Sequence, residues 1–213
     1  MITGTGSLEE RVARLRRERG LLTPAELMDL ADQGVVVLDP FSVIVSRRVR
    51  LHPENVLYPG VVIECDERSG CLVRRGNVLH GGTLITATGG GTIVIGARSE
   101  IGEGGARIRA AGTDTIDIGD GTRLTGGAEV TGTSRIGSGA QVLGQVSARS
   151  VTLAAGHPYT YPDPDGRGAV LKGFGRALGI RLGVGEVVNG SGDFRDAPVE
   201  RQRVYHPEAP RLG

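Results

Sequence analysis

The feature that most limits how this chain can fold is an aliphatic residue at every sixth position. Near the start, the spacing links four valines and one asparagine: Val37, Val43, Val49, Asn55 and Val61. Further along, it links Ile118, Leu124, Val130, Ile136 and Val142. A helix repeats its buried face about every 3.6 residues and a strand every second residue, so neither element alone explains a period of six.

A period of six is typical of a parallel β-helix, in which short strands form flat sides and turns form the corners. Three sides of about six residues make a coil of about 18, which places Ile118 under Ile136 and Leu124 under Val142. A single coil cannot bury its aliphatic side chains, but stacked coils share one narrow core. The sequence therefore predicts an all-β fold: a parallel β-helix with short N-terminal helices and an irregular C-terminal tail.

The composition agrees with this fold. Glycine accounts for 36 of the 213 residues, and aromatic residues make up only 3%. Tight corners need backbone conformations that a Cβ atom resists, which suits a high glycine content. With so few aromatic residues, we expect no core built on large rings. The alternative is a β-sandwich of many short strands, which requires period-2 alternation and turns every 8–12 residues.

Two helices are expected before the repeats, over residues 7–19 and 23–33. Ser7 and Glu10 have the spacing of a capping box at the start of the first helix. The second helix carries several start and stop signals: Thr23, Pro24, Glu26 and, after its end, Gly34. A bare end of a β-helix exposes apolar side chains and unpaired backbone, so we expect these helices to cap the first coil.

The pattern divides the chain into three parts. We expect a helical cap over 1–34, the β-helix over 35–153, and a loop, short strands and a polar tail over 154–213. The polar stretch 66–94 interrupts the six-residue spacing. The segment AVLKGFGRALGIRLGVGEVVNG indicates further short strands, either a last coil or a hairpin.

Charge and cysteine content exclude several classes of protein. The net charge is +1, which argues against a general nucleic-acid binder. No apolar run approaches the roughly 20 residues that a membrane span requires. Only two cysteines and no signal peptide favour a reducing, cytoplasmic location. Cys65 and Cys71 lie in CDERSGC, where too few suitable ligands lie nearby for zinc, so we expect no metal site.

The stretch from the second predicted helix into the first repeats resembles a known family. The matching positions are Gly34, Val35, Asp39, Pro40, Val49, Val56, Tyr58 and Pro59. They are similar to the start of the acyltransferase domain of the bifunctional N-acetylglucosamine-1-phosphate uridyltransferase/glucosamine-1-phosphate acetyltransferase. The resemblance covers residues 24–65 well and 95–153 only as general six-residue repeats. With 213 residues, the chain has no room for that family's nucleotidyltransferase domain, so we expect no uridylyl transfer.

The resemblance implies a left-handed coil, a homotrimer with ligand sites between subunits, and acyl transfer from acyl-coenzyme A to an amino-sugar or another small amine. The family's histidine stands in a G-H-x-x-Y context. Here Gly156 and His157 match, with Tyr159 at +2 and Tyr161 at +4 rather than a tyrosine at +3. His157 is the candidate base, with Tyr159 and Tyr161 beside it, because a histidine titrates near neutral pH.

Other residues are weaker candidates. Paired arginines on the outer faces could bind coenzyme A phosphates, or could be a solvated surface: Arg47, Arg48, Arg74 and Arg75. His80 is a second candidate base, His52 is expected on an outer face, and no catalytic role is expected for His206.

Three functions remain open from the sequence. One is the trimeric acyltransferase. Another is a trimeric scaffold or sugar-nucleotide binding protein without catalysis, including a partner of a separate nucleotidyltransferase. A further possibility is a different transferase or lyase built on the same coil, because a fold does not imply a function.

Overall fold

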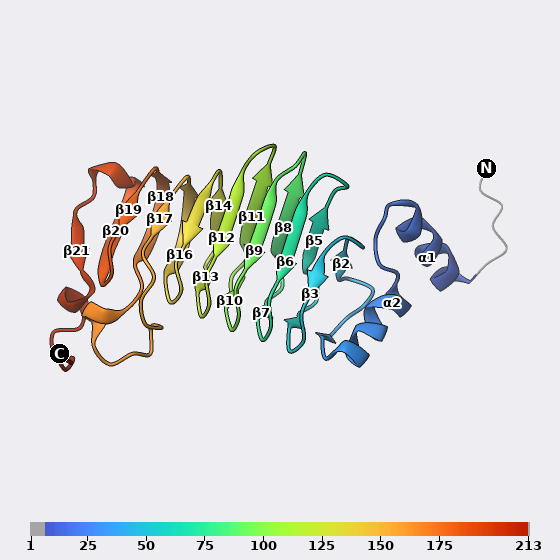
Figure 1. Cartoon of the computed structure of the whole chain (residues 1–213), viewed down its shortest axis with the longest axis horizontal. Coiled ribbons are helices and arrows are strands. Elements are labelled where there is room, and N and C mark those ends of the chain that lie inside the picture. Colours follow the sequence, from blue (N-terminus) through green and yellow to red (C-terminus); the bar gives the residue numbers. More distant parts are fainter. Residues whose placement is uncertain (1–6, 213) are drawn as a thin grey trace.

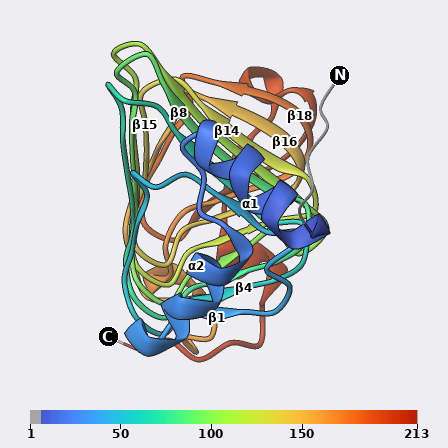
Figure 2. The same cartoon turned by 90° about the vertical axis from the view of Figure 1, so that its right-hand side faces the viewer.

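The computed structural model describes residues 7–212, which form a long stack of parallel strands with helices at one end (Figure 1). Residues 1–6 of the predicted cap lie outside this range. The coils wind around three faces, seen along the stack in Figure 2. Neighbouring coils pair only in parallel, and the one antiparallel strand pair in residues 7–212 joins β20 to β21 at the end of the stack. A β-sandwich is built from antiparallel sheets, so that alternative is excluded. The handedness of the coil stays a prediction.

Each face is a ladder of short strands. The first face contains β1 (Val36–Val37), β4 (Val56–Leu57), β7 (Val78–Leu79), β10 (Glu100–Ile101) and β13 (Arg123–Thr125). The second contains β2 (Ile44–Val45), β5 (Val62–Cys65), β8 (Thr83–Thr88), β11 (Ala106–Ala111) and β14 (Ala128–Thr131). The third contains β3 (Arg50–Leu51), β6 (Gly70–Val73), β9 (Thr92–Ile95), β12 (Thr115–Ile118), β15 (Ser134–Ile136), β17 (Thr152–Leu153) and β19 (Arg181–Leu182).

Towards the C-terminus the first and second faces merge into long strands. These are β16 (Gln141–Arg149), β18 (Val170–Leu178) and β20 (Glu186–Asp193). They turn the corner at three stacked glycines, Gly144, Gly173 and Gly190. Gly173 has φ +117°, and a Cβ there would lie 2.0 Å from the Gly190 oxygen. The segment 170–193 therefore adds coils to the stack and is not a hairpin.

The predicted 18-residue coil is correct in one region and wrong in another. Ile118 pairs with Ile136 and Leu124 with Val142, as predicted. Earlier, Val78 pairs with Val56 on one side and Glu100 on the other, an offset of 22 residues. The stretch 66–94, which interrupts the six-residue spacing in the sequence, contains regular strands of the stack. The residues that exceed the 18-residue coil lie largely in the corners, so the strands on each face stay in register.

Stacked aliphatic side chains form the core. Ile63, Ile85, Ile108 and Val130 follow one another on the second face, and all four are fully buried. Complete burial of such a side chain stabilises a fold by about 1.5–3 kcal/mol. Repetition of this contact from coil to coil holds the stack together without large aromatic rings.

A ladder of buried polar side chains lies at the corner before the first face. It consists of Asn55, Asn77, Ser99 and Thr122. Asn55 Oδ1 accepts from the Asn77 backbone at 2.9 Å, Asn77 Oδ1 from Ser99 at 2.8 Å, and Ser99 Oγ from Thr122 at 3.1 Å. Each of the first three side chains satisfies a buried N–H group of the next coil, which explains why an asparagine occupies an otherwise aliphatic repeat.

Both ends of the stack are covered. Helix α1 (Leu8–Glu18) begins at Ser7 and α2 (Pro24–Asp29) at Thr23, each with the predicted capping box. A short 3₁₀ helix, η1 (Leu30–Gln33), continues α2 and ends at Gly34 in the left-handed conformation. Leu27 of α2 is fully buried in the core, so α2 packs against this end of the stack.

At the other end, β21 (Val199–Arg201) covers the edge of β20. Three further 3₁₀ turns shape the C-terminal region: η2 (Pro164–Gly166), η3 (Phe194–Asp196) and η4 (Gln202–Tyr205). No helix in residues 7–212 is long and apolar enough to cross a membrane.

Candidate functional site

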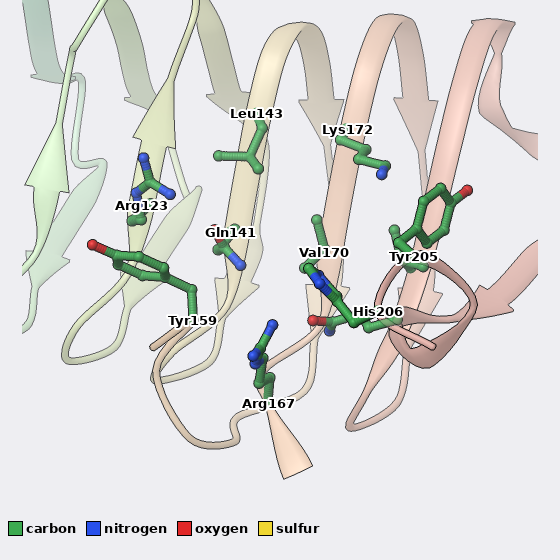
Figure 3. A pocket seen from close by; sticks show the side chains of 11 residues that line it. Arg123, Gln141, Leu143, Tyr159, Arg167, Val170, Lys172, Tyr205 and His206 are labelled. Atoms are coloured by element: carbon green, nitrogen blue, oxygen red, sulfur yellow. The ribbon is translucent and has the colours of Figure 1, made fainter. Parts of the chain in front are cut away.

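A pocket of about 250 Å³ opens on the first face near the C-terminal end (Figure 3). We call it the C-terminal pocket. Its lining is Arg123, Gln141, Leu143, Tyr159, Arg167, Val170, Lys172, Val187, Gln202, Tyr205 and His206. Strands β13, β16, β18 and β20 supply the floor, the loop before β18 supplies one wall, and the C-terminal tail supplies the other.

The lining is rich in cationic groups. Arg123, Arg167 and Lys172 all contribute, and Figure 3 shows their charged ends around the same hollow. No aspartate or glutamate belongs to the lining, as far as residues 7–212 are concerned. A concave site with several cations and no lining carboxylate favours an anionic ligand.

Arg123 is held in place from two sides. Its Nε donates to Glu100 Oε2 at 3.2 Å, and its guanidinium carbon lies 4.4 Å from the centre of the Tyr159 ring. A guanidinium over an aromatic face is stabilised by the ring quadrupole. The loop tyrosine therefore orients a cation of the pocket floor.

Lys172 occupies the opposite side. Its Nζ lies 3.5 Å from the centre of the Tyr205 ring, and desolvation by burial lowers its pKa, with Glu200 acting in the opposite direction. The Tyr205 hydroxyl donates to Glu200, and this hydrogen bond raises the pKa of Tyr205. Tyr205 thus packs against the only lysine of the chain.

His206 is the one histidine of this pocket. Desolvation lowers its pKa below the ordinary value, and the positive charges of Arg167 and Lys172 lower it further. A lowered pKa favours the neutral imidazole, which has a lone pair that can accept a proton. No sequence signal identifies His206, because it lies in a polar tail far from the repeats.

A charged latch holds the tail against the loop. Arg203 donates to Asp163 and Asp165, and Arg201 also donates to Asp165. The N–H of Leu212 donates to Asp163 Oδ2 at 2.8 Å. These contacts hold η4 in position, and with it the wall that carries Tyr205 and His206.

Of the two tyrosines predicted beside the candidate base His157, only Tyr161 contacts it. The His157 ring stacks on Tyr161, with ring centres 3.9 Å apart and planes inclined by 17°. Tyr159 lines the C-terminal pocket, whereas His157 is exposed and outside the lining. The His157 backbone joins two parts of the loop, since its N–H donates to Gly166. His157 as the base therefore stays a prediction.

The four predicted phosphate-binding arginines lie on two corners at the other end of the stack. Arg47 and Arg48 follow β2, and Arg47 pairs with Glu26 of α2 at 2.6 Å. Arg74 and Arg75 follow β6, and Arg75 pairs with Glu54. None of the four lines the C-terminal pocket. Several coils separate them from His157 within one chain.

The cysteines belong to the core. Cys65 and Cys71 are both buried and free, and desolvation raises the pKa of each thiol, to about 12 for Cys71. Within residues 7–212, no group of three histidine, cysteine, aspartate or glutamate side chains is placed to hold a metal ion.

Comparison with known proteins identifies no family for this chain. No model of a known protein family matches the chain, and no curated protein sequence matches it significantly. The fold and the C-terminal pocket are therefore the grounds on which a function can be proposed.

Proposed function

We propose that the protein binds a small anionic molecule of the sugar-phosphate class in the C-terminal pocket. The observation that carries this proposal is the convergence of Arg123, Arg167 and Lys172 on one hollow without a lining carboxylate. Apolar side chains beside the cations, Leu143 and Val170, suit the carbon face of a sugar. The amide of Gln141 and the imidazole of His206 are available for its hydroxyl or amino groups.

Calorimetric titration with glucosamine 1-phosphate tests the proposal, with glucosamine as the neutral control. A hydrogen bond to a charged group contributes about 1.5–3 kcal/mol, so loss of one cation should weaken binding about 10- to 100-fold. Lys172→Met removes the charge and retains the length of the side chain. Arg181→Met, an exposed change on the third face, is the matched control and should leave the affinity unchanged.

Equal affinity for the phosphorylated and neutral sugars would refute anion recognition. So would equal effects of Lys172→Met and Arg181→Met. Absence of any binding would favour the remaining alternative, a trimeric scaffold or a partner subunit of a separate nucleotidyltransferase.

A second candidate function is acyl transfer from acyl-coenzyme A to an amine of the bound molecule. The observation that favours it is the position of His206, which lines the pocket together with Lys172 and Arg167 and whose pKa is lowered there. The amine nitrogen would bond to the acyl carbon, and its proton would pass to His206 Nε2 or Nδ1. The carbon–sulfur bond would then break, and the sulfur would take that proton from His206 to leave as the thiol of coenzyme A. A left-handed coil and a homotrimer are part of this second proposal.

Thiol release from acetyl-coenzyme A in the presence of glucosamine 1-phosphate measures this activity. His206→Gln should lower turnover about 10²- to 10⁴-fold. His52→Gln, an exposed histidine on another part of the stack, is the control. Loss of turnover in His157→Gln but not in His206→Gln would transfer the role of base to His157. No turnover under any condition would leave binding as the function.

A further inference from the structure

The first face carries an aromatic pair well away from the C-terminal pocket. Tyr58 follows β4 and His80 follows β7, and these strands are paired. The two ring centres lie 5.0 Å apart, with planes inclined by 33°. Tyr58 is 38% exposed and the His80 side chain 26% exposed, so the pair forms a small aromatic platform open to solvent. We call it the Tyr58–His80 platform.

One polar atom of the platform has no partner. His80 Nε2 is buried and makes no hydrogen bond within residues 7–212. The nearest carboxylate oxygen, Glu100 Oε1, lies at 3.7 Å, beyond hydrogen-bond distance. A buried nitrogen without a partner is uncommon, and a ligand hydroxyl that reaches it after a small shift of the side chains covering it would satisfy it.

The platform and the pocket lie on the same face of the stack. From β7, the ladder leads through β10, β13 and β16 to β18, which carries Lys172. Four steps at a strand spacing of about 4.8 Å place the two ends about 19 Å apart. The side chains between them are polar: Glu100 comes next to His80, and Arg123 pairs with Glu100 and lies over Tyr159. The surface therefore changes from aromatic, through hydrogen-bonding groups, to cationic.

We propose that this face binds a glycan chain whose end residue carries an anionic group. The anionic end would lie in the C-terminal pocket, so this inference rests on the proposed function for that end. The opposite sugar would pack its C–H face on the Tyr58–His80 platform, where dispersion and apolar burial favour contact with an aromatic ring. Hydroxyl groups in between would meet Glu100 and Arg123. Sugar residues along a chain are spaced much like the coils, so successive sugars would meet successive coils.

A rival occupant of this surface is a second copy of the chain. Exposed apolar side chains, Val36 and Leu38, lie on the first coil beside the platform. A protein interface there would bury the platform without any sugar. The unpaired His80 nitrogen and the continuous path to the cations favour the glycan, because neither is needed to bury an apolar patch.

Calorimetric titration with glucose 1-phosphate and with maltopentaose 1-phosphate, which is anionic at one end only, tests the inference, with maltopentaose as the neutral chain. We expect the acidic pentasaccharide to bind about three- to tenfold more tightly than the acidic monosaccharide. Tyr58→Ala should abolish this gain and leave binding of the monosaccharide unchanged. His80→Ala should reduce the gain, and His52→Ala, an exposed histidine off this face, should not. Galacturonic acid in place of glucose 1-phosphate shows whether the pocket prefers a phosphate or a carboxylate.

Other results would overturn the inference. Equal affinity for the monosaccharide and the pentasaccharide would show that the platform makes no contact, while the proposed function of the pocket would stand. Failure of every ligand would refute both proposals. Equal binding of maltopentaose and the acidic chain would refute the anionic end alone. A lower oligomer mass for Tyr58→Ala in sedimentation equilibrium would identify the face as an interface between copies.

Discussion

The buried polar ladder allows the sharpest test of how this stack is stabilised. Asn77 is fully buried and makes three side-chain hydrogen bonds. Its Oδ1 accepts from the Ser99 N–H at 2.8 Å, and its Nδ2 donates to Asn55 Oδ1 at 3.0 Å and to the Arg74 oxygen at 2.7 Å. Asn77→Ala removes all three at once and leaves a small cavity at the corner.

The expected cost depends on the groups left behind. The Ser99 N–H remains buried with no acceptor, whereas Asn55 Oδ1 still accepts from the Asn77 backbone. An unpaired buried group costs about 1–3 kcal/mol, and each further lost hydrogen bond about 0.5–1.5 kcal/mol. We therefore expect Asn77→Ala to lower the free energy of unfolding by about 2–6 kcal/mol. That is a large part of the stability of an ordinary domain, about 5–15 kcal/mol.

Urea denaturation followed by far-ultraviolet circular dichroism measures this change, since the chain contains no tryptophan. Gln33→Ala, an exposed amide at the end of η1, is the matched control and should change stability by less than about 0.5 kcal/mol. A loss below about 1 kcal/mol in Asn77→Ala would refute the reasoning. Such a result would mean that water takes over the hydrogen bonds of the missing side chain, or that these hydrogen bonds form in the folded coil without adding to its stability.

Three further predictions concern the core, the thiols and the latch. Ile108→Ala should lower the free energy of unfolding by about 2–5 kcal/mol in the same assay, because the side chain is fully buried between two coils; a loss under about 1 kcal/mol would contradict the stacked core. Burial raises the pKa of Cys71 to about 12, so a thiol reagent at pH 8 should modify it only after denaturation, and rapid labelling of the native protein would show that the thiol is accessible. Arg203→Gln should speed proteolysis of the C-terminal tail, and unchanged cleavage would show that the latch does not hold it. Hydrogen bonding to Arg203 lowers the pKa of Asp165, so the latch stabilises the fold above the ordinary aspartate pKa of about 4 and loses this effect as pH falls through the lower, folded value. The difference in melting temperature between Arg203→Gln and the wild type should therefore be largest near pH 7 and vanish in acid.

Local features of the chain can be predicted because their causes are local. The capping boxes at Ser7 and Thr23 depend on residues three positions apart, and both form as expected. The aliphatic spacing over 118–142 correctly predicts which side chains stack, because each coil there has 18 residues, three times the six-residue period. The 22-residue offsets at Val78 escape prediction, because residues added at a corner break the spacing in sequence without breaking the ladder in space.

The candidate site depends on contacts that no local pattern reports. The sequence names Tyr159 as a candidate because it lies close to His157. Its partner Arg123 lies on β13, which is two steps along the ladder from β18, the strand that follows the Tyr159 loop. The sequence predicts no role for His206, which enters the pocket because Arg203 reaches Asp163, 40 residues away in the chain.

By itself, the sequence determined that the chain forms a stack of parallel coils with helices on one end, because burial of a repeated aliphatic side chain allows few other solutions. Only the tertiary structure decided which charged residues share a pocket and which form ion pairs elsewhere. The reason is physical: burial by stacking repeats with the chain, whereas a latch such as Arg203 with Asp163 and Asp165 joins segments whose separation in sequence follows no period.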